Sequence, residues 1–155
     1  MPKVALGTKV PDFSLPSTGG ETFSLKAAAG KALVIYFYPK DMTSGCTREA
    51  QDFRDRHAAF LAAGARVAGI SRDSLAAHDK FTSQERLPFE LLSDADERVC
   101  RLFDVIREKS LYGRKYLGIE RSTFLIDKRG VLRHEWRKVK VPGHVEQVLE
   151  AARAL

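Results

Sequence analysis

The stretch VIYFYPKDMTSGCTREAQ, residues 34–51, decides how this chain folds. It begins with β-branched and aromatic residues, which predict a strand buried on both faces, and Pro39 ends that strand. Apolar side chains then recur at helical spacing, so a long helix is predicted to begin near Gly45 and to close at Gly64. Cys46 therefore lies in the first turn of a helix that follows a buried strand. Because the unpaired N–H groups and positive dipole end of a helix stabilise a thiolate, we interpret Cys46 as a nucleophile.

The flanking segments alternate between helical and extended patterns. Helices are predicted from Asp73 or Ser74 to about Glu85, from Ser93 or Asp94 through Phe103, and from Pro142 through Ala152. Strands are predicted over 65–71, 89–92, 122–127 and 131–136, and an N-terminal hairpin over 13–15 and 21–25. Residues 104–118 show no clean period and are predicted to form a long loop. Together these elements predict an α/β chain with a thioredoxin-like fold, in which helices flank a mixed central sheet and an N-terminal hairpin lies beside it.

Length and composition predict a single domain over residues 1–155. The chain is 44% hydrophobic and 30% charged, and no apolar run approaches the roughly 20 residues that cross a bilayer. The first residues lack the pattern of a signal peptide, so we expect a cytoplasmic protein that does not bind membranes. With only two cysteines, Cys46 and Cys100, reduced thiols are expected rather than a structural disulfide.

Positive charge is concentrated between Arg107 and Lys140. This region holds 11 Lys or Arg and 4 Asp or Glu, within a chain whose formal net charge is +6. Such a region is usually a solvated face, and the alternatives are attraction of an anionic partner or of nucleic acid. Because no nucleic-acid-binding motif accompanies it, we expect no nucleic-acid partner.

A known signature coincides with the junction of strand and helix. The run PKDMTSGC, residues 39–46, matches the Pro-x-x-x-Thr/Ser-x-x-Cys pattern of peroxiredoxins. With LLSD at 91–94 and YLGIERSTFLID at 116–127, the chain resembles the bacterioferritin comigratory protein or peroxiredoxin Q subfamily over nearly its whole length. The resemblance implies a thiol-dependent peroxidase that reduces hydrogen peroxide and organic hydroperoxides, as a monomer or weak dimer. It also implies that Arg121 completes the site. We expect no cofactor and no metal.

The residue types of the signature suit this chemistry. Cleavage of an O–O bond needs an ionised sulfur and donors that stabilise the leaving oxygen, and helix N–H groups serve both needs. Thr43 is expected to place its hydroxyl beside the Cys46 sulfur, and Pro39 to cover the pocket with apolar surface and limit water. An arginine such as Arg121 stays charged and presents several donors at once. The candidate catalytic residues are thus Cys46, Thr43, Pro39 and Arg121.

The chain departs from the subfamily at the resolving cysteine. Relatives with an internal resolving thiol carry it at positions that are Gln51 and Thr82 here, and neither residue can form a disulfide. Cys100 remains, beside an apolar stripe of the third predicted helix, where small buried cysteines are common. We therefore expect an external thiol, either thioredoxin, glutaredoxin or glutathione, to regenerate Cys46 as in one-cysteine peroxiredoxins. The alternatives are that Cys100 resolves, or that Cys46 serves a peroxide sensor or redox-switched binding module without turnover.

Other cysteine chemistries fit the sequence less well. A dithiol oxidoreductase needs Cys-x-x-Cys, and no second cysteine follows Cys46 at that spacing. A cysteine hydrolase needs a histidine base, but His57 lies about 16 Å along the predicted helix at 1.5 Å per residue. The other histidines, His78, His134 and His144, stand in no recognisable motif. Two separated cysteines without paired histidines argue against a structural zinc site.

Overall fold

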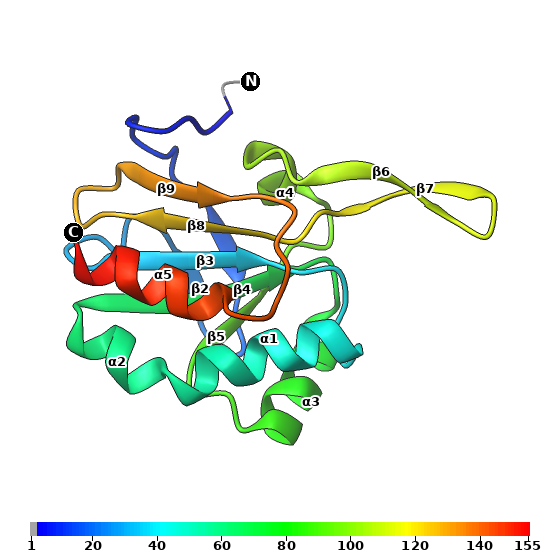
Figure 1. Ribbon diagram of the computed structural model, residues 1–155, viewed down its shortest axis with the longest axis horizontal. Helices are drawn as coiled ribbons and strands as arrows, with labels where there is room; N and C mark the ends of the chain where they lie inside the picture. The colour runs from blue at the N-terminus through cyan, green and yellow to red at the C-terminus, as the bar shows by residue number, and fades with distance from the viewer. Residues whose placement is uncertain (1–2) are drawn as a thin grey trace.

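Five strands form the central sheet of the structure, a computed structural model that describes residues 3–155 (Figure 1). Their order across the sheet is β5–β4–β3–β8–β9. β3 and β5 both run parallel to β4, whereas β8 runs antiparallel to β3 and β9 antiparallel to β8. The expected mixed sheet is therefore confirmed. The strand bounds are β3 Ala32–Phe37, β4 Ala65–Ser71, β5 Glu90–Ser93, β8 Ser122–Ile126 and β9 Leu132–Trp136.

The central strand β3 is apolar because it serves two cores. Every residue of this strand is buried. Successive side chains of a strand point to opposite faces, so Leu33, Ile35 and Phe37 enter one core while Val34 and Tyr36 enter the other. The apolar run in the sequence is thus the middle layer of the molecule.

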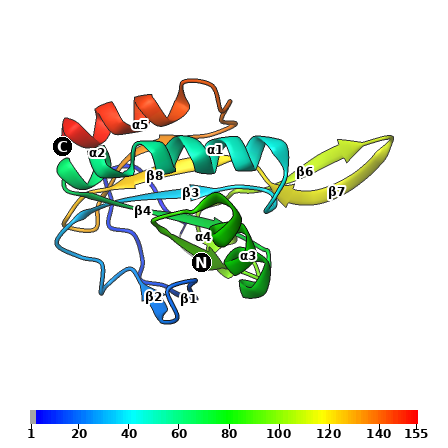
Figure 2. The same cartoon turned by 90° about the horizontal axis from the view of Figure 1, so that it is seen from below.

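Helices cover both faces of the sheet, but unequally. The helices α1 (Ser44–Asp55), α2 (His57–Ala62) and α5 (His144–Arg153) lie together on one face (Figure 2). Phe81 of α3 (Leu75–Glu85) packs into the core on that side. The opposite core is covered by the short helix α4 (Arg98–Leu102) and by the expected N-terminal hairpin, which is confirmed. Within residues 3–155, no helix is long and apolar enough to cross a membrane. The bounds of the hairpin strands are β1 Ser14–Pro16 and β2 Thr22–Ser24.

Residues 104–118, predicted to be a long loop, instead form most of a two-stranded hairpin. β6 (Ile106–Leu111) and β7 (Arg114–Ile119) pair antiparallel and extend away from the body of the protein (Figure 1). The two turn residues, Tyr112 and Gly113, both have positive φ, at 51° and 77°, as a type I′ turn requires. The prediction was wrong because most of the hairpin rests on no core, so apolar and polar residues do not alternate along it.

The single long helix predicted over residues 45–64 is two helices. The break is at Arg56, whose φ and ψ of −109° and 8° are not helical. Phe60 of the second helix packs against Phe53 of the first in the core, while Leu61 is 51% exposed. The apolar spacing that suggested one helix therefore belongs to two segments.

The third helix, α4, is shorter than predicted. Glu97 adopts a φ of 65°, and the helix begins at Arg98 rather than directly after Asp94. Asp94 still acts as a cap, because its carboxylate accepts the backbone N–H groups of Val99 and Cys100 at 3.2 and 2.6 Å. The prediction of Ser93 or Asp94 as the cap is therefore met only in part: Asp94 binds the first N–H groups of the helix, but the N-cap position is Glu97, one turn later.

Candidate active site

Cys46 lies at the junction of β3 and α1. The strand ends at Phe37, and the helix begins at Ser44 with Thr43 as its N-cap residue. The Thr43 side chain makes no capping hydrogen bond, so the first N–H groups of α1 can face a thiolate or a ligand. Cys46 is only 2% exposed, which restricts the approach of solvent to its sulfur.

A guanidinium from the neighbouring strand contacts this sulfur. Arg121 immediately precedes β8, and its Nη2 lies 3.4 Å from Cys46 Sγ. Its Nη1 donates to Glu49 Oε1 at 2.7 Å. Glu49 follows Cys46 by three residues and therefore shares its face of α1. Gly45 makes room for this arrangement, because a Cβ there would lie 3.1 Å from Arg121 Nη2. Sulfur, guanidinium and carboxyl thus form one cluster.

The carboxyl of this cluster has an unusual ionisation. Glu49 is fully buried, and burial is the main cause that raises its pKa from 4.5 to about 7, against the opposing effect of the Arg121 charge. The second oxygen, Oε2, is buried without a hydrogen-bond partner among the described residues. For Arg121, burial acts to lower the pKa, but the charges of Glu49 and Cys46 outweigh burial and raise it. Glu49 therefore titrates near neutral pH beside an arginine that stays charged.

Sequence reasoning identified neither Glu49 nor Gly45 as part of the site. A signal for Glu49 was present, since it occupies the buried stripe of α1 with Cys46, Ala50 and Phe53. A charged residue in such a stripe is unfavourable unless it is paired, so it points to a buried partner. Gly45 carried no comparable signal, because the close guanidinium comes from a distant segment.

The structure places Pro39 and Thr43 in the loop between β3 and α1. Pro39 is half-buried, whereas Thr43 is exposed. The Thr43 hydroxyl donates to the Lys40 carbonyl at 2.8 Å, which leaves its oxygen lone pairs available to accept from a ligand. Cys46 and Arg121 are in contact, and Thr43 stands at the start of the same helix. The catalytic roles of these four candidate residues stay predictions.

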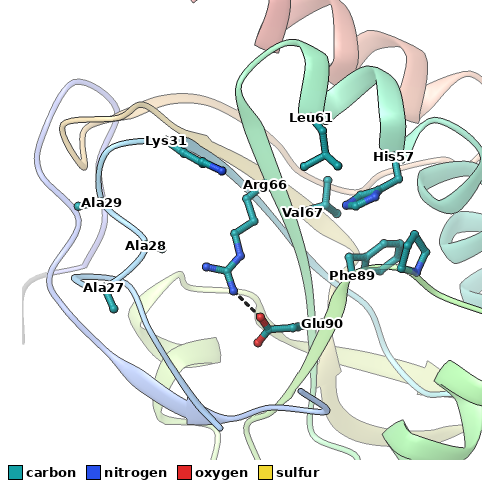
Figure 3. Close-up of a pocket in the computed structure, with 11 residues that line it drawn as sticks. Ala27, Ala28, Ala29, Lys31, His57, Leu61, Arg66, Val67, Phe89 and Glu90 are labelled. Carbon is teal, nitrogen blue, oxygen red and sulfur yellow. Dashed lines mark hydrogen bonds and ion pairs between the residues drawn. The ribbon is translucent and has the colours of Figure 1, made fainter. Parts of the chain in front are cut away.

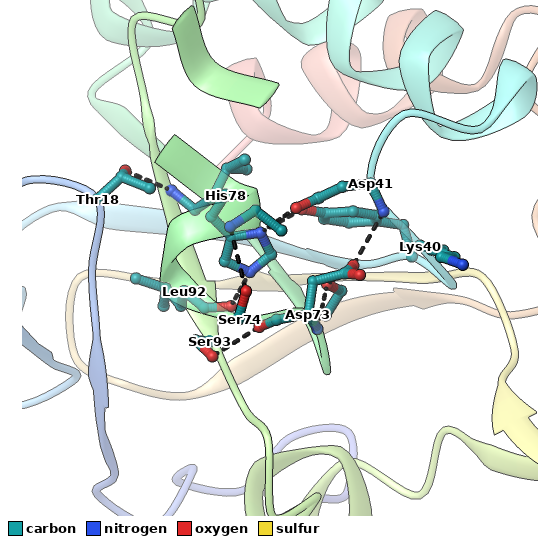
Figure 4. Close-up of polar contacts among 12 residues, drawn as sticks. Thr18, Lys40, Asp41, Asp73, Ser74, His78, Leu92 and Ser93 are labelled. Atoms are coloured by element: carbon teal, nitrogen blue, oxygen red, sulfur yellow. Dashed lines mark hydrogen bonds and ion pairs between the residues drawn. The ribbon is translucent and has the colours of Figure 1, made fainter. Parts of the chain in front are cut away.

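A buried hydrogen-bond network anchors this loop (Figure 4). Asp41 accepts the Tyr38 hydroxyl at 2.6 Å and lies 2.6 Å from His78 Nδ1. His78 Nε2 lies 2.9 Å from the Leu92 carbonyl, which can only accept, so this nitrogen carries a proton. The backbone N–H of Asp41 donates to Asp73 at 2.9 Å. The loop that precedes Cys46 is therefore fixed to α3 and to the end of β5.

Two of the histidines, His78 and His144, take part in structural hydrogen bonds rather than in contacts with the sulfur. Asp41, Asp73 and His78 place three potential metal ligands within 4.8 Å of one another. We assign no metal to them, because both nitrogens of His78 and the facing Asp73 oxygen already take part in hydrogen bonds. His144 Nε2 bonds to Thr123 Oγ1 at 2.8 Å, and burial, followed by the Arg121 charge, lowers its pKa to about 4. His144 is thus neutral at physiological pH.

Comparison with known proteins identifies the family. The family model described as the AhpC/TSA family matches residues 6–135. The chain belongs to this family of peroxiredoxins. Peroxiredoxin Bcp of Xanthomonas campestris pv. campestris is 52% identical over 143 residues, covering 92% of this chain and 89% of that protein. Peroxiredoxin Bcp of Bacillus subtilis is 50% identical over 147 residues, covering 95% and 94%.

A solved structure extends the likeness to three dimensions. It concerns the alkyl peroxide reduction activity of the Xanthomonas campestris bacterioferritin comigratory protein, in trapped intermediate and ligand complexes. It matches this peroxiredoxin with a TM-score of 0.87 and 51% identity, covering 92% of this chain and 90% of that one. The thioredoxin-like fold and the bacterioferritin comigratory protein or peroxiredoxin Q resemblance are confirmed, and the enzyme class is that of a thiol peroxidase.

The second cysteine of this peroxiredoxin lies in the other core. Cys46 belongs to the core beneath α1, and Cys100 belongs to the core on the opposite face of the sheet. Both are free thiols. Burial, reinforced by the Asp94 carboxylate, raises the pKa of the Cys100 thiol, so it forms thiolate poorly. Gln51 and Thr82, where the subfamily resemblance led us to look for a resolving cysteine, lie in α1 and α3.

The peroxiredoxin also has a cleft of about 420 Å³ that is remote from Cys46 (Figure 3). Its lining includes Lys31, Arg66 and Glu90, which stand at the amino ends of β3, β4 and β5. Arg66 and Glu90 form an ion pair within it. Cys46, in contrast, follows the carboxyl end of β3, so this cleft is not part of the thiol site.

Proposed function

We propose that this peroxiredoxin reduces hydrogen peroxide and organic hydroperoxides through Cys46, and that an external thiol regenerates the cysteine. The observation that carries the proposal is the position of the sulfur, at the start of a helix and 3.4 Å from the Arg121 guanidinium. Organic hydroperoxides are included because the Xanthomonas campestris relative is described by its alkyl peroxide reduction activity.

In the first proposed step, the Cys46 thiolate attacks one oxygen of the peroxide. A sulfur–oxygen bond forms while the O–O bond breaks, which leaves Cys46 as a sulfenic acid and releases water or an alcohol after proton uptake. The charge of Arg121 and the helix N–H groups stabilise the thiolate and the negative charge that develops on the leaving oxygen. Thr43 contributes a hydroxyl to the bound peroxide, and Pro39 shields the site from water.

In the second proposed step, an external thiol attacks the sulfenic sulfur, forms a mixed disulfide and releases water. A further thiol then reduces this disulfide and restores the Cys46 thiolate. Cys100 is a poor candidate for the internal alternative, because an S–S bond requires the two Cα atoms within about 7 Å in a suitable orientation. The two thiols lie in cores on opposite faces of the sheet, so the bond would require the sheet to open.

Two serine variants and one mass measurement test this function. Peroxide consumption with excess dithiothreitol should persist in Cys100→Ser and disappear in Cys46→Ser. After one equivalent of peroxide, a sulfenic acid trapped with dimedone should appear on Cys46. Consumption of a single equivalent by the wild type would identify a sensor instead of an enzyme, and a dominant 46–100 disulfide would replace the external route by an internal one.

A further inference from the structure

The β6–β7 hairpin exposes an unusual amount of apolar surface. Residues 3–155 include eight large hydrophobic side chains that are exposed, and four of them belong to this one hairpin. Tyr112 at its turn is 95% exposed. Exposed apolar side chains that gather on one element in this way mark interaction sites in soluble proteins. The four residues are Leu111, Tyr112, Tyr116 and Leu117.

Little of this apolar surface packs against the rest of the chain. It extends from the body as a separate two-stranded sheet, so both of its faces and much of its edges meet solvent (Figure 1). Near its base, Arg72 Nη1 donates to the Leu117 carbonyl at 3.3 Å. An isolated two-stranded hairpin is at best marginally stable in water, and open strand edges invite pairing with another chain. These properties fit an arm that is completed by a partner.

One face of the hairpin combines apolar and positive side chains. The register pairs Lys109 with Tyr116 and Leu111 with Arg114, so these four residues share a face. Lys109 and Arg114 make no ion pair within residues 3–155, whereas Lys115 lies 3.5 Å from a carboxylate oxygen of its own hairpin. A second copy of a chain with net charge +6 would bring like charges together here. The complementary partner is acidic.

The same face leads to the thiol site. The Lys109 stem and the Tyr116 ring lie against Gly118, since a Cβ there would stand 3.3 Å from each. Burial and the positive charge of Arg121 lower the pKa of Lys109, and the charge of Cys46 acts in the opposite direction. Lys109 is therefore within electrostatic range of the reacting groups. Arg121 itself follows the end of β7 by two residues.

We propose that this face, formed by Lys109, Leu111, Arg114 and Tyr116 with Tyr112 at its tip, docks an acidic dithiol protein of thioredoxin type that reduces oxidised Cys46. The inference rests on the external-thiol route proposed above. One thiolate of the partner attacks the sulfenic sulfur, and an intermolecular disulfide forms with release of water. The partner's second thiol then attacks the partner's own sulfur in that disulfide. Cys46 leaves as a thiolate, and the partner, which has given up two electrons, leaves as a disulfide.

A charge-reversal pair tests the docking face. The arm variant is Lys109→Glu with Arg114→Glu, the two basic residues of the docking face. Its matched control is Lys128→Glu with Arg129→Glu, two exposed basic residues at the β8–β9 turn. Each lowers the net charge by the same four units. For each variant we measure the KM for an acidic bacterial thioredoxin. Its kcat with thioredoxin is divided by its turnover rate with dithiothreitol, so that changes in the peroxide reaction itself cancel. The arm variant should raise KM roughly five- to tenfold and lose salt dependence, while the control changes less than about twofold. Tyr112→Ser should raise KM without altering salt dependence.

Binding without turnover separates the two proposals. Calorimetric titration of the Cys46→Ser protein with reduced thioredoxin should show weaker binding only when the arm substitutions are added. If the wild type fails to consume peroxide with dithiothreitol, the proposed function is wrong. The titration still tests the docking face, because it measures binding of thioredoxin without turnover. Equal effects of arm and control, or no effect of either, would overturn the docking inference. Two other results would also overturn it. One is that the wild type binds phosphatidylglycerol vesicles and the arm substitutions abolish this binding. The other is that the wild type sediments as a dimer and the arm substitutions make it a monomer.

Discussion

Replacing Glu49 with Gln should stabilise the protein selectively at neutral and alkaline pH. In the folded chain the pKa of Glu49 is about 7, against an ordinary value of 4.5, so the folded state holds this proton more tightly than the unfolded state. Below about pH 4.5 both states are protonated, and the favourable contribution is fully present. As the pH rises through about 7, that contribution is lost, and the free energy of unfolding falls. Gln cannot ionise and should escape this loss.

The size of the effect follows from the pKa. A rise from 4.5 to about 7 corresponds to about 3 kcal/mol at 1.36 kcal/mol per pKa unit. For a chain of this length, this difference amounts to roughly 10 °C in Tm. The gain should be accompanied by slower turnover above pH 7, because a neutral amide holds the Arg121 guanidinium less strongly than a carboxylate does. We expect this loss to be severalfold.

Urea unfolding between pH 4.5 and 8.5 measures the free energy of unfolding of both proteins, with the fluorescence of Trp136, the single tryptophan, as the signal. The difference between Glu49→Gln and wild type should grow with pH. Glu150→Gln is the matched control, because Glu150 is exposed and, within residues 3–155, pairs only with Arg153 at the surface. Its unfolding curves should track the wild type throughout. A difference for Glu49→Gln that stays constant across this pH range would refute the reasoning.

Three further substitutions probe the site. Arg121→Met removes the donor at the Cys46 sulfur and should slow turnover about a hundredfold in stopped-flow peroxide assays, with partial recovery in Arg121→Lys. An unaltered rate would show that the arginine has no part in catalysis. Gly45→Ala should leave the free energy of unfolding unchanged or raise it by up to about 1 kcal/mol, because alanine favours helix. The same methyl group displaces the guanidinium, so turnover should fall severalfold, and full activity would contradict the close contact. Cys100→Ala should destabilise the core by about 1 kcal/mol in denaturant titrations and retain dithiothreitol-driven turnover, whereas loss of turnover would make Cys100 the resolving thiol.

The junction at Cys46 could be predicted because its signals are local. A continuous apolar run, a proline and a helical period follow one another within residues 34–51, and each is legible without tertiary contacts. The hairpin at 106–119 could not be predicted in this way, because most of it lacks a buried face to impose alternation. Its Tyr112-Gly113 turn was the remaining signal, and tyrosine is an uncommon choice for a positive φ.

The cluster around the sulfur depends on strand register, which the residues alone do not reveal. β8 pairs with β3 so that Ser122 lies opposite Phe37, and this register sets Arg121 beside the carboxyl end of β3. Family resemblance supplied Arg121, whereas its partner Glu49 followed from neither source. A buried acid becomes interpretable only when the cation that compensates it is known.

The bonds between Asp41 and His78 also bear on how the molecule loosens. Opening α3 alone, or the segment before Cys46 alone, would leave buried polar groups without partners. The two regions should consequently open as one cooperative unit, with amide hydrogens in both exchanging at a shared free energy. Fluctuations that expose the sulfur are thereby coupled to a helix that begins more than 25 positions later in the chain.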